Sequence, residues 1–262
     1  RFDPLKLYVG NPGLRPEYSH RGRLNFTTFS APTGIFLSGS LSMNYTTNPI
    51  AMAVSIDERQ VRTTRYVNLD RRENVAAFLN AGFPLKKWNS RINLGPFLRQ
   101  DRSQNILNGI TGAVNQRSFG SNIGYTYSYK ENVELVLGAY ISATSSDYEL
   151  NQNQNQFFVN SVYTADTRVQ FLKAYAITAA FNYSRFRNRQ TSFDQAIPIL
   201  NLALSRYVLK DNKGEVRLSG HNLFDQSVGA TQVATINYVE QSVQNTLGRY
   251  YMLSFLYNFK LY

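Results

Sequence analysis

The sequence YMLSFLYNFKL, residues 251–261, is the clearest indication of the fold class. Its odd positions are all large and apolar, namely Tyr251, Leu253, Phe255, Tyr257, Phe259 and Leu261. Its even positions are mixed and include the cation Lys260. Because successive side chains of a β-strand point to opposite faces, the stretch predicts a strand with one apolar face and one wetter face.

The same alternation recurs along the chain at 35–46, 119–129, 133–144 and 175–184. In each segment one parity is mostly apolar or aromatic, and the other is mostly small and polar, as at Ser38 and Ser40. An apolar helix face would repeat every 3.6 residues instead of every second residue, so these segments are predicted strands. The sequence therefore predicts an all-β protein.

The predicted strands are joined by connections of two kinds, which alternate along the chain. Short turns are expected at 31–34, 85–90, 130–132, 172–174 and 209–214, and long polar loops at 47–61, 102–116, 147–156, 187–195 and 226–246. Short turns at one end and long loops at the other are typical of a transmembrane antiparallel up-and-down β-barrel of the bacterial outer membrane. A soluble β-sandwich would mix loop lengths at both ends.

The strand count is about eleven, from five hairpins and the last strand, and the strands at 63–83 and 91–100 are expected to be less regular. Pro96 requires a bulge or a ladder position without a donor. Single-chain bacterial barrels have even strand numbers, because both chain ends lie in the periplasm. An odd count therefore predicts that residues 1–262 are the C-terminal part of a larger barrel domain, since an open sheet would expose two unpaired edges.

Composition narrows the class of partner. The net charge is +11, but Lys and Arg are spread along the chain and form no long basic arm, so we expect no nucleic-acid binding. The charge fits a basic lumen and basic loops that face an anionic surface glycolipid. The absence of cysteine excludes a disulfide scaffold and a thiolate metal site. No apolar run is long enough to predict a transmembrane helix.

Two short motifs and the terminal strand resemble known outer-membrane proteins. VGNPGLRPE, residues 9–17, resembles the GNPxLxPE signature of TonB-dependent outer-membrane receptors through Gly10, Asn11, Pro12, Leu14, Pro16 and Glu17. NLFD looks like an element near the C-terminus of those receptors, and consists here of Asn222, Leu223, Phe224 and Asp225. GRYYMLSF, residues 248–255, is similar to the terminal strand of the outer-membrane β-barrel family common in Bacteroidetes. The two motif prolines favour a rigid extracellular turn over direct ligand contact.

The resemblance implies a barrel of about 22 strands with a plugged lumen, of which this chain would be half. It implies import of a scarce nutrient, such as a siderophore, glycan or peptide, across the outer membrane of a Gram-negative bacterium into the periplasm. The expected partners are outer-membrane lipid, the rest of the barrel and its plug, the TonB complex and a surface lipoprotein. The plug domain is not expected within these residues.

Two other functions stay open at this point. One is a non-transporting β-barrel scaffold in an outer-membrane surface or secretion and assembly complex. The other is an enzyme, which would need His20 or His221 beside a carboxylate such as Glu17 or Asp225, and the spacing selects neither pair. We therefore expect no enzyme activity and no catalytic, cofactor-binding or metal site.

The terminal strand also sets the expected orientation. Its apolar parity, Tyr251 to Leu261, is predicted to face lipid. The C-terminus is predicted to lie in the periplasm together with the short turns.

Overall fold

The computed structural model describes residues 6–130, 132–188, 190–234 and 239–259. Within them, eleven strands form an antiparallel meander in which each strand pairs with the next one in the series. The meander strands are β2 (Tyr18–Ser30), β3 (Ile35–Thr47), β6 (Arg71–Leu85), β7 (Ser90–Leu107), β8 (Ile110–Tyr129), β9 (Val133–Tyr148), β10 (Gln156–Phe171), β11 (Tyr175–Asn188), β12 (Phe193–Val208), β13 (Gly214–His221) and β16 (Tyr250–Tyr257). The predicted all-β fold with an up-and-down series of about eleven strands is confirmed.

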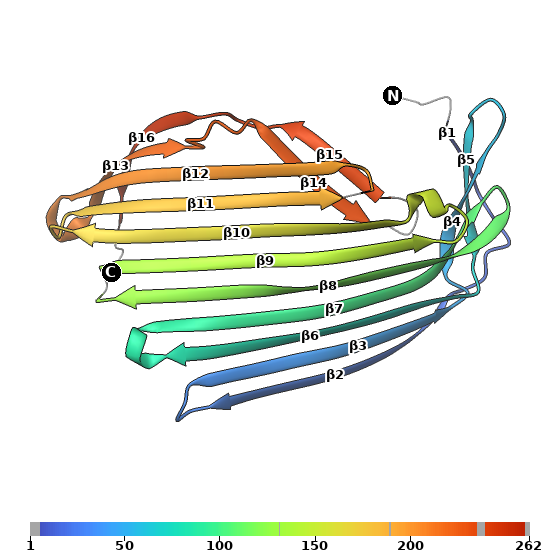
Figure 1. Cartoon of the computed structure of the whole chain (residues 1–262), viewed down its shortest axis with the longest axis horizontal. Helices are drawn as coiled ribbons and strands as arrows, with labels where there is room; N and C mark the ends of the chain where they lie inside the picture. Colours follow the sequence, from blue (N-terminus) through green and yellow to red (C-terminus); the bar gives the residue numbers. More distant parts are fainter. Residues whose placement is uncertain (1–5, 131, 189, 235–238, 260–262) are drawn as a thin grey trace.

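The meander is curved and open (Figure 1). Among the described residues, β2 pairs only with β3, and β16 pairs only with β13. The sheet therefore does not close on itself, and completion of a barrel by further strands stays a prediction. No helix in the described part of the chain is long and apolar enough to cross a membrane.

One end of the sheet, which we call the turn end, carries the five predicted short turns. They join β2 to β3, β6 to β7, β8 to β9, β10 to β11 and β12 to β13. Two of them contain single turns of 3-10 helix, Lys86–Trp88 and Lys210–Asn212. The opposite end, the loop end, carries every other connection of the meander.

The loop end differs from the sequence prediction in two connections. The long loop expected at 102–116 is wrong, because β7 runs to Leu107 and β8 begins at Ile110. The loop expected at 187–195 is shorter, since β11 ends at Asn188 and β12 begins at Phe193. Toward the loop end both faces of these strands carry polar residues, so no apolar alternation marks them in the sequence.

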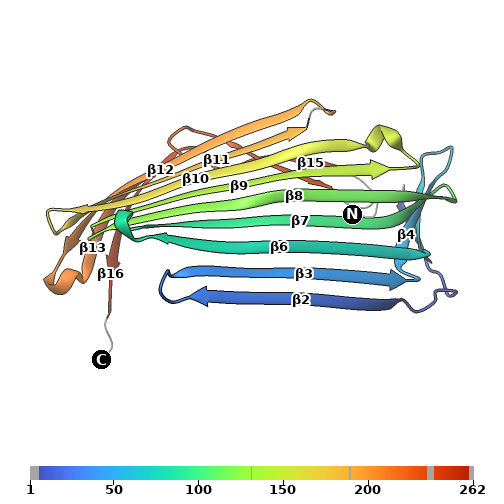
Figure 2. The same ribbon diagram turned by 60° about the horizontal axis from the view of Figure 1, so that its bottom comes forward.

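Two predicted loops contain hairpins of their own. The first, expected at 47–61, holds β4 (Ile50–Ile56), which pairs with β5 (Arg62–Asn68) just after it. The single strand expected at 63–83 is wrong, because it is divided between β5 and β6. β1 (Lys6–Val9) pairs in parallel with β5, and this group stands across the long strands at the loop end (Figures 1 and 2). The second holds β14 (Val228–Ala234) and β15 (Val239–Asn245), which form a separate two-stranded sheet.

The remaining loop, expected at 147–156, occupies residues 149–155 and includes a 3-10 turn at Gln152–Gln154. The predicted interruption at Pro96 is present. The pairing of β6 with β7 is interrupted between Phe78↔Phe97 and Ala81↔Leu94, because Pro96 has no N–H for the ladder.

The strand register assigns every meander side chain to one of two faces. We call one the apolar face; a row across it from β6 to β10 reads Ala81, Leu94, Ile123, Ala139 and Tyr163. We call the other the polar face; its adjacent row reads Gly82, Asn93, Gly124, Gly138 and Thr164. This is the two-faced wall that the alternating sequence predicts.

The apolar residues of the apolar face form a band next to the turn end, which we call the apolar band. On β6 it covers positions 75–85, and Arg71 and Glu73 lie beyond it toward the loop end. On β7 it ends at Leu98, and on β11 at Tyr183. A strand segment of this length, tilted as in barrels, gives a band about 25 Å tall, which matches the lipid-facing band of outer-membrane barrels.

The terminal strand β16 continues both faces. Its register with β13 places Tyr251, Leu253, Phe255 and Tyr257 on the apolar face. Phe259 follows the end of the strand, and Leu261 lies outside the described residues. β16 ends at the turn end, where the Asn258 N–H donates to the Lys213 carbonyl at 2.8 Å.

Candidate functional site: a pocket on the polar face

The β14–β15 hairpin folds back onto the polar face near the loop end. Gln232 of β14 is almost fully buried, with 4% of its surface exposed. The Asn160 amide on β10 donates to the Gln232 carbonyl at 3.2 Å, and the Gln232 amide donates to Asn160 Oδ1 at 3.1 Å. Gln241 of β15 donates to Gln232 Oε1 at 2.7 Å and to Thr191 Oγ1 at 2.8 Å. The hairpin is therefore fastened to the sheet by side-chain amides.

Between the hairpin and the sheet lies a pocket of about 690 Å³, the polar-face pocket. Its sheet residues all lie on the polar face of five neighbouring strands, β6 to β10. Its lining consists of Arg72, Phe97, Arg99, Asp101, Gln116, Ser118, Tyr140, Ser142, Thr144, Phe158, Asn160, Gln232 and Val233.

One wall of the polar-face pocket is a stacked aromatic pair. The rings of Phe97 and Tyr140 lie nearly parallel, at 9°, with centroids 6.0 Å apart. Gly120 belongs to β8, the strand between the two rings. It pairs with Phe97 of β7 on one side, and β9, which carries Tyr140, is the neighbouring strand on the other side. A Cβ at Gly120 would come within 2.8 Å of Phe97 Cζ, so the absence of a side chain is what lets the ring lie across β8.

The polar groups of the pocket can bind an uncharged or anionic ligand. Arg72 and Arg99 supply guanidinium donors, while the Asp101 carboxylate accepts a hydrogen bond from the Asn74 amide at 2.8 Å. Ser118 and Thr144 share a hydrogen bond of 2.9 Å across β8 and β9. A flat aromatic surface beside donors and hydroxyls suits recognition of a polar molecule that carries a ring or an extended planar group.

The NLFD motif holds the base of the β14–β15 hairpin. Asn222 is buried, with 7% exposed, and its amide donates to the carbonyls of Gln226 at 2.7 Å and Leu247 at 2.9 Å. Its Oδ1 accepts the Gln226 N–H at 3.0 Å, and Asp225 Oδ1 accepts the Arg249 N–H at 2.8 Å. Together these bonds, which we call the Asn222 clamp, tie the two ends of the hairpin excursion to each other.

The other two NLFD residues lie beside the sheet. The Leu223 N–H donates to the Leu200 carbonyl at 2.8 Å. The Phe224 ring packs edge-on against Phe181, with centroids 6.4 Å apart. Both contacts anchor the motif to β11 and β12.

The GNPxLxPE motif lies at the loop end, against the β4–β5 hairpin and away from the polar-face pocket. The Asn11 amide donates to the Tyr66 carbonyl at 2.9 Å, and its Oδ1 accepts from the Gly13 N–H at 3.1 Å and from Arg65 Nη2 at 3.0 Å. Glu17 accepts the Ile50 N–H at 3.2 Å. Gly10, Pro12 and Pro16 are exposed, and Leu14 is half-buried.

The two histidines lie apart, on different faces of the sheet. His20 is on the apolar face of β2, opposite Tyr45. His221 lies on the polar face, 3.0 Å from Ser219 Oγ, and stacks on the Tyr250 ring. Glu17 and Asp225, the carboxylates considered for pairing with them, instead accept backbone N–H groups. Absence of catalysis stays a prediction.

Metal ligands do not gather in the part of the chain that the structure describes. No group of three His, Asp or Glu side chains there is placed to hold an ion.

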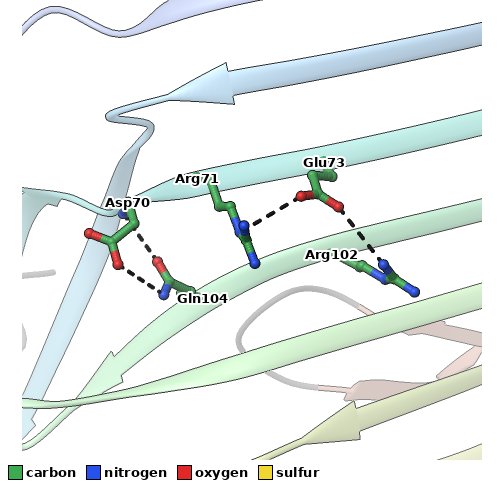
Figure 3. A network of polar contacts seen from close by, with 5 residues as sticks. All are labelled: Asp70, Arg71, Glu73, Arg102 and Gln104. Carbon is green, nitrogen blue, oxygen red and sulfur yellow. Dashed lines mark hydrogen bonds and ion pairs between the residues drawn. The ribbon is translucent and has the colours of Figure 1, made fainter.

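Beyond the apolar band, the apolar face becomes charged at the loop end. On β6 and β7, Arg71 and Arg102 share the carboxylate of Glu73, with N–O distances of 3.7 and 4.0 Å (Figure 3). Asp70 and Gln104 exchange two hydrogen bonds beside them. A second cluster on β11 and β12 also joins two arginines through one carboxylate. There, Arg185 and Arg187 share the carboxylate of Asp194.

The lining residues of the polar-face pocket were not singled out in the sequence. On β7, β9 and β10 the positions that face the polar side are otherwise mostly small or polar. Aromatic side chains interrupt this pattern at Phe97, Tyr140 and Phe158, and that interruption is the signal that could have marked them. Asn160 and Gln232 are 72 positions apart, and no local pattern connects them.

Comparison with known proteins agrees with the fold. Residues 1–119 match the model of the family described as "Outer membrane protein beta-barrel family". The matched segment is under half of the chain and includes the GNPxLxPE motif and the strands β1 to β7. No curated protein matches the chain. The match and the all-β architecture support an outer-membrane β-barrel and a location in the outer membrane.

Proposed function

We propose that this chain forms part of the wall of an outer-membrane receptor that imports a scarce polar nutrient by a TonB-dependent route. The observation that carries the proposal is the polar-face pocket, where arginines, amides and hydroxyls surround a stacked aromatic pair. The resemblance of VGNPGLRPE and NLFD to receptors of that type supports it. A siderophore, a glycan and a peptide all present the hydrogen-bonding groups that such a lining recognises.

In this proposal the apolar band faces lipid and the polar face lines the lumen. The turn end and the C-terminus of β16 lie in the periplasm, and the loop end lies outside the cell. The polar-face pocket, near the loop end, would then meet the ligand first. The β14–β15 hairpin would cover the ligand from the lumen side.

Within the described residues the outer edges of β2 and β16 have no pairing strand, which supports completion of the barrel by further strands. An open edge inside lipid would leave backbone N–H and C=O groups without partners, at a cost of several kcal/mol for each group. A plug and an inner-membrane TonB complex would supply gating and energy from outside this chain. A surface lipoprotein is the further partner that we propose.

The test is nutrient uptake by the full-length protein in its own bacterium. Cells would be grown with single siderophores, glycans or peptides as the limiting source, with and without the TonB-interacting segment. Import predicts that one nutrient class requires both the protein and that segment. In a strain that imports, Arg99→Gln should raise the half-saturating nutrient concentration about tenfold, since hydrogen bonds to charged groups contribute roughly 1.5–3 kcal/mol each.

The matched control is Arg168→Gln. Arg168 also lies on the polar face, but at the turn end, where its guanidinium donates to the Tyr207 hydroxyl. This variant should leave uptake near normal. If no nutrient requires the protein, while a complex with other outer-membrane proteins persists without the TonB-interacting segment, the chain serves as a scaffold and the import proposal fails. Hydrolysis that is lost on changing His20 or His221 would instead indicate an enzyme.

A further inference from the structure

A second pocket opens on the opposite side of the sheet, on the apolar face between β10 and β11, where the apolar band ends on β11 at Tyr183. Its volume is about 430 Å³. Six of its residues carry the argument: Phe157, Val159, Tyr163, Tyr183, Arg185 and Arg187. All six belong to the apolar face, because Tyr163 pairs with Tyr183, and Val159 pairs with Arg187.

The pocket has a tyrosine floor, a cationic rim on β11 and an apolar side on β10 that is formed by Phe157 and Val159. Tyr163 and Tyr183 form the floor, with ring centroids 6.2 Å apart, at the edge of the apolar band. Small side chains on the neighbouring strands leave space for the pocket. Ala143 of β9 lies opposite Val159, and Ala196 of β12 lies opposite Arg185. Tyrosines at such a boundary are typical of the interface between lipid chains and headgroups.

The two arginines of the rim are held side by side by one carboxylate. Arg185 donates to Asp194 through Nε at 3.0 Å and through Nη2 at 2.8 Å, and Arg187 Nε lies 3.5 Å from Asp194 Oδ2. Asp194 is at the loop end, beyond the apolar band, and the hydrogen bond from Arg185 holds its pKa below the usual range.

The cluster keeps donors and charge available for a ligand. Two guanidinium groups and one carboxylate leave a net charge of +1. The other guanidinium N–H groups of the two arginines do not donate to Asp194. The side chains of Arg185 and Arg187 are 38% and 47% exposed. Paired guanidinium groups match the geometry of a phosphate oxyanion.

The geometry points to a lipid-binding site on the outside of the barrel wall, in which Arg185 and Arg187 hold the phosphate of an outer-leaflet glycolipid and Tyr163 and Tyr183 contact the start of its acyl chains. The site rests on the membrane orientation proposed above. A phosphate at the level of Arg185 places the acyl chains along the apolar band below it, where Ala179 and Phe181 continue β11. An anionic ligand without acyl chains would leave the tyrosine floor unused.

The experiment uses the full-length protein in detergent, incubated with bis-phosphorylated lipid A and analysed by native mass spectrometry. The expected result is a retained lipid A adduct. Arg185→Gln with Arg187→Gln should lower its affinity about tenfold or more, since hydrogen bonds to a charged phosphate are lost. Dephosphorylated lipid A should bind as weakly to the unchanged protein, and inorganic phosphate should not displace the adduct.

The matched control is Arg206→Gln. Arg206 is also on the apolar face, beside the Tyr175 ring, but at the turn end. Its change should leave lipid A binding unaltered. Equal retention of phosphorylated and dephosphorylated lipid A, an equal loss in Arg206→Gln, or no loss in the double variant would overturn the proposal. Nutrient import is measured separately, so a failure of lipid binding with import intact rejects this site alone.

Discussion

The Asn222 clamp allows a prediction whose size follows from three hydrogen bonds. Replacing Asn222 by Gly removes the bonds to the Gln226 carbonyl, the Leu247 carbonyl and the Gln226 N–H. At about 1 kcal/mol for each bond, opening of the hairpin base should become easier by about 3 kcal/mol. Such a change corresponds to about 100-fold faster exchange under conditions where the opening equilibrium governs the exchange rate.

Glycine is chosen because Asn222 has a positive φ of 51°. Gly adopts this conformation without strain, so the effect of Asn222→Gly comes mainly from the lost hydrogen bonds, with a smaller contribution from the greater freedom of the opened chain. Asn222→Ala adds the cost of a left-handed alanine, so its effect should be larger by about 1 kcal/mol. The difference between the two variants separates backbone strain from hydrogen bonding.

The assay is hydrogen–deuterium exchange of the full-length protein in detergent, followed by mass spectrometry of peptides from β14 and β15. Gln244→Ala is the control, since Gln244 is exposed on β15 and contributes none of the clamp bonds. Faster exchange confined to the hairpin supports the clamp. Unchanged exchange in Asn222→Gly, or an equal increase in β8 and β9, would show that the Asn222 side chain does not hold the hairpin base.

Two further predictions concern packing on each face of the sheet. Gly120→Ala should lower the free energy of unfolding by about 1–3 kcal/mol in urea titrations, because the new methyl group meets the Ile141 carbonyl oxygen first and then the Phe97 ring; Gly124→Ala, whose Cβ would stay 3.7 Å from Asn93, should be close to neutral. Leu137→Arg should destabilise the folded protein in lipid vesicles by about 2–4 kcal/mol, since Leu137 lies within the apolar band, whereas Thr164→Arg on the polar face should cost much less. Equal effects of the two glycine variants would contradict the close packing at Gly120, and equal effects of Leu137→Arg and Thr164→Arg would contradict the face assignment.

The sequence predicted the parts of the fold where the two faces of a strand differ in chemistry. β9 and β11 were recognisable because Leu135 and Leu137, or Ile177 and Phe181, alternate with small and polar residues. The ends of β7 and β8 were not, because Gln100, Arg102 and Arg117 make the apolar face polar there. At the loop end these strands continue through backbone pairing. Because both faces are polar there, the side chains show no two-residue alternation in the sequence.

The candidate site was less predictable than the fold. The polar-face pocket requires β6 to β10 to stand in register, and it requires a hairpin from 72 positions away to return to Asn160. For the NLFD motif, the sequence indicated the end of a strand, and the structure adds the reason for its Asn and Asp. Their short side chains bond nearby backbone groups, as these residues often do in turns.

The most direct test of the central claim is the accessibility of single labels along β9. The 262 residues contain no cysteine, so cysteines introduced at 135–142 can each carry a spin label in the protein reconstituted in lipid. Labels at 135, 137, 139 and 141 should collide mainly with oxygen dissolved in lipid, and labels at 136, 138, 140 and 142 should collide mainly with a water-soluble nickel complex. A two-residue period of this phase supports a membrane wall with a polar lumen face; the opposite phase, or no period, would contradict it.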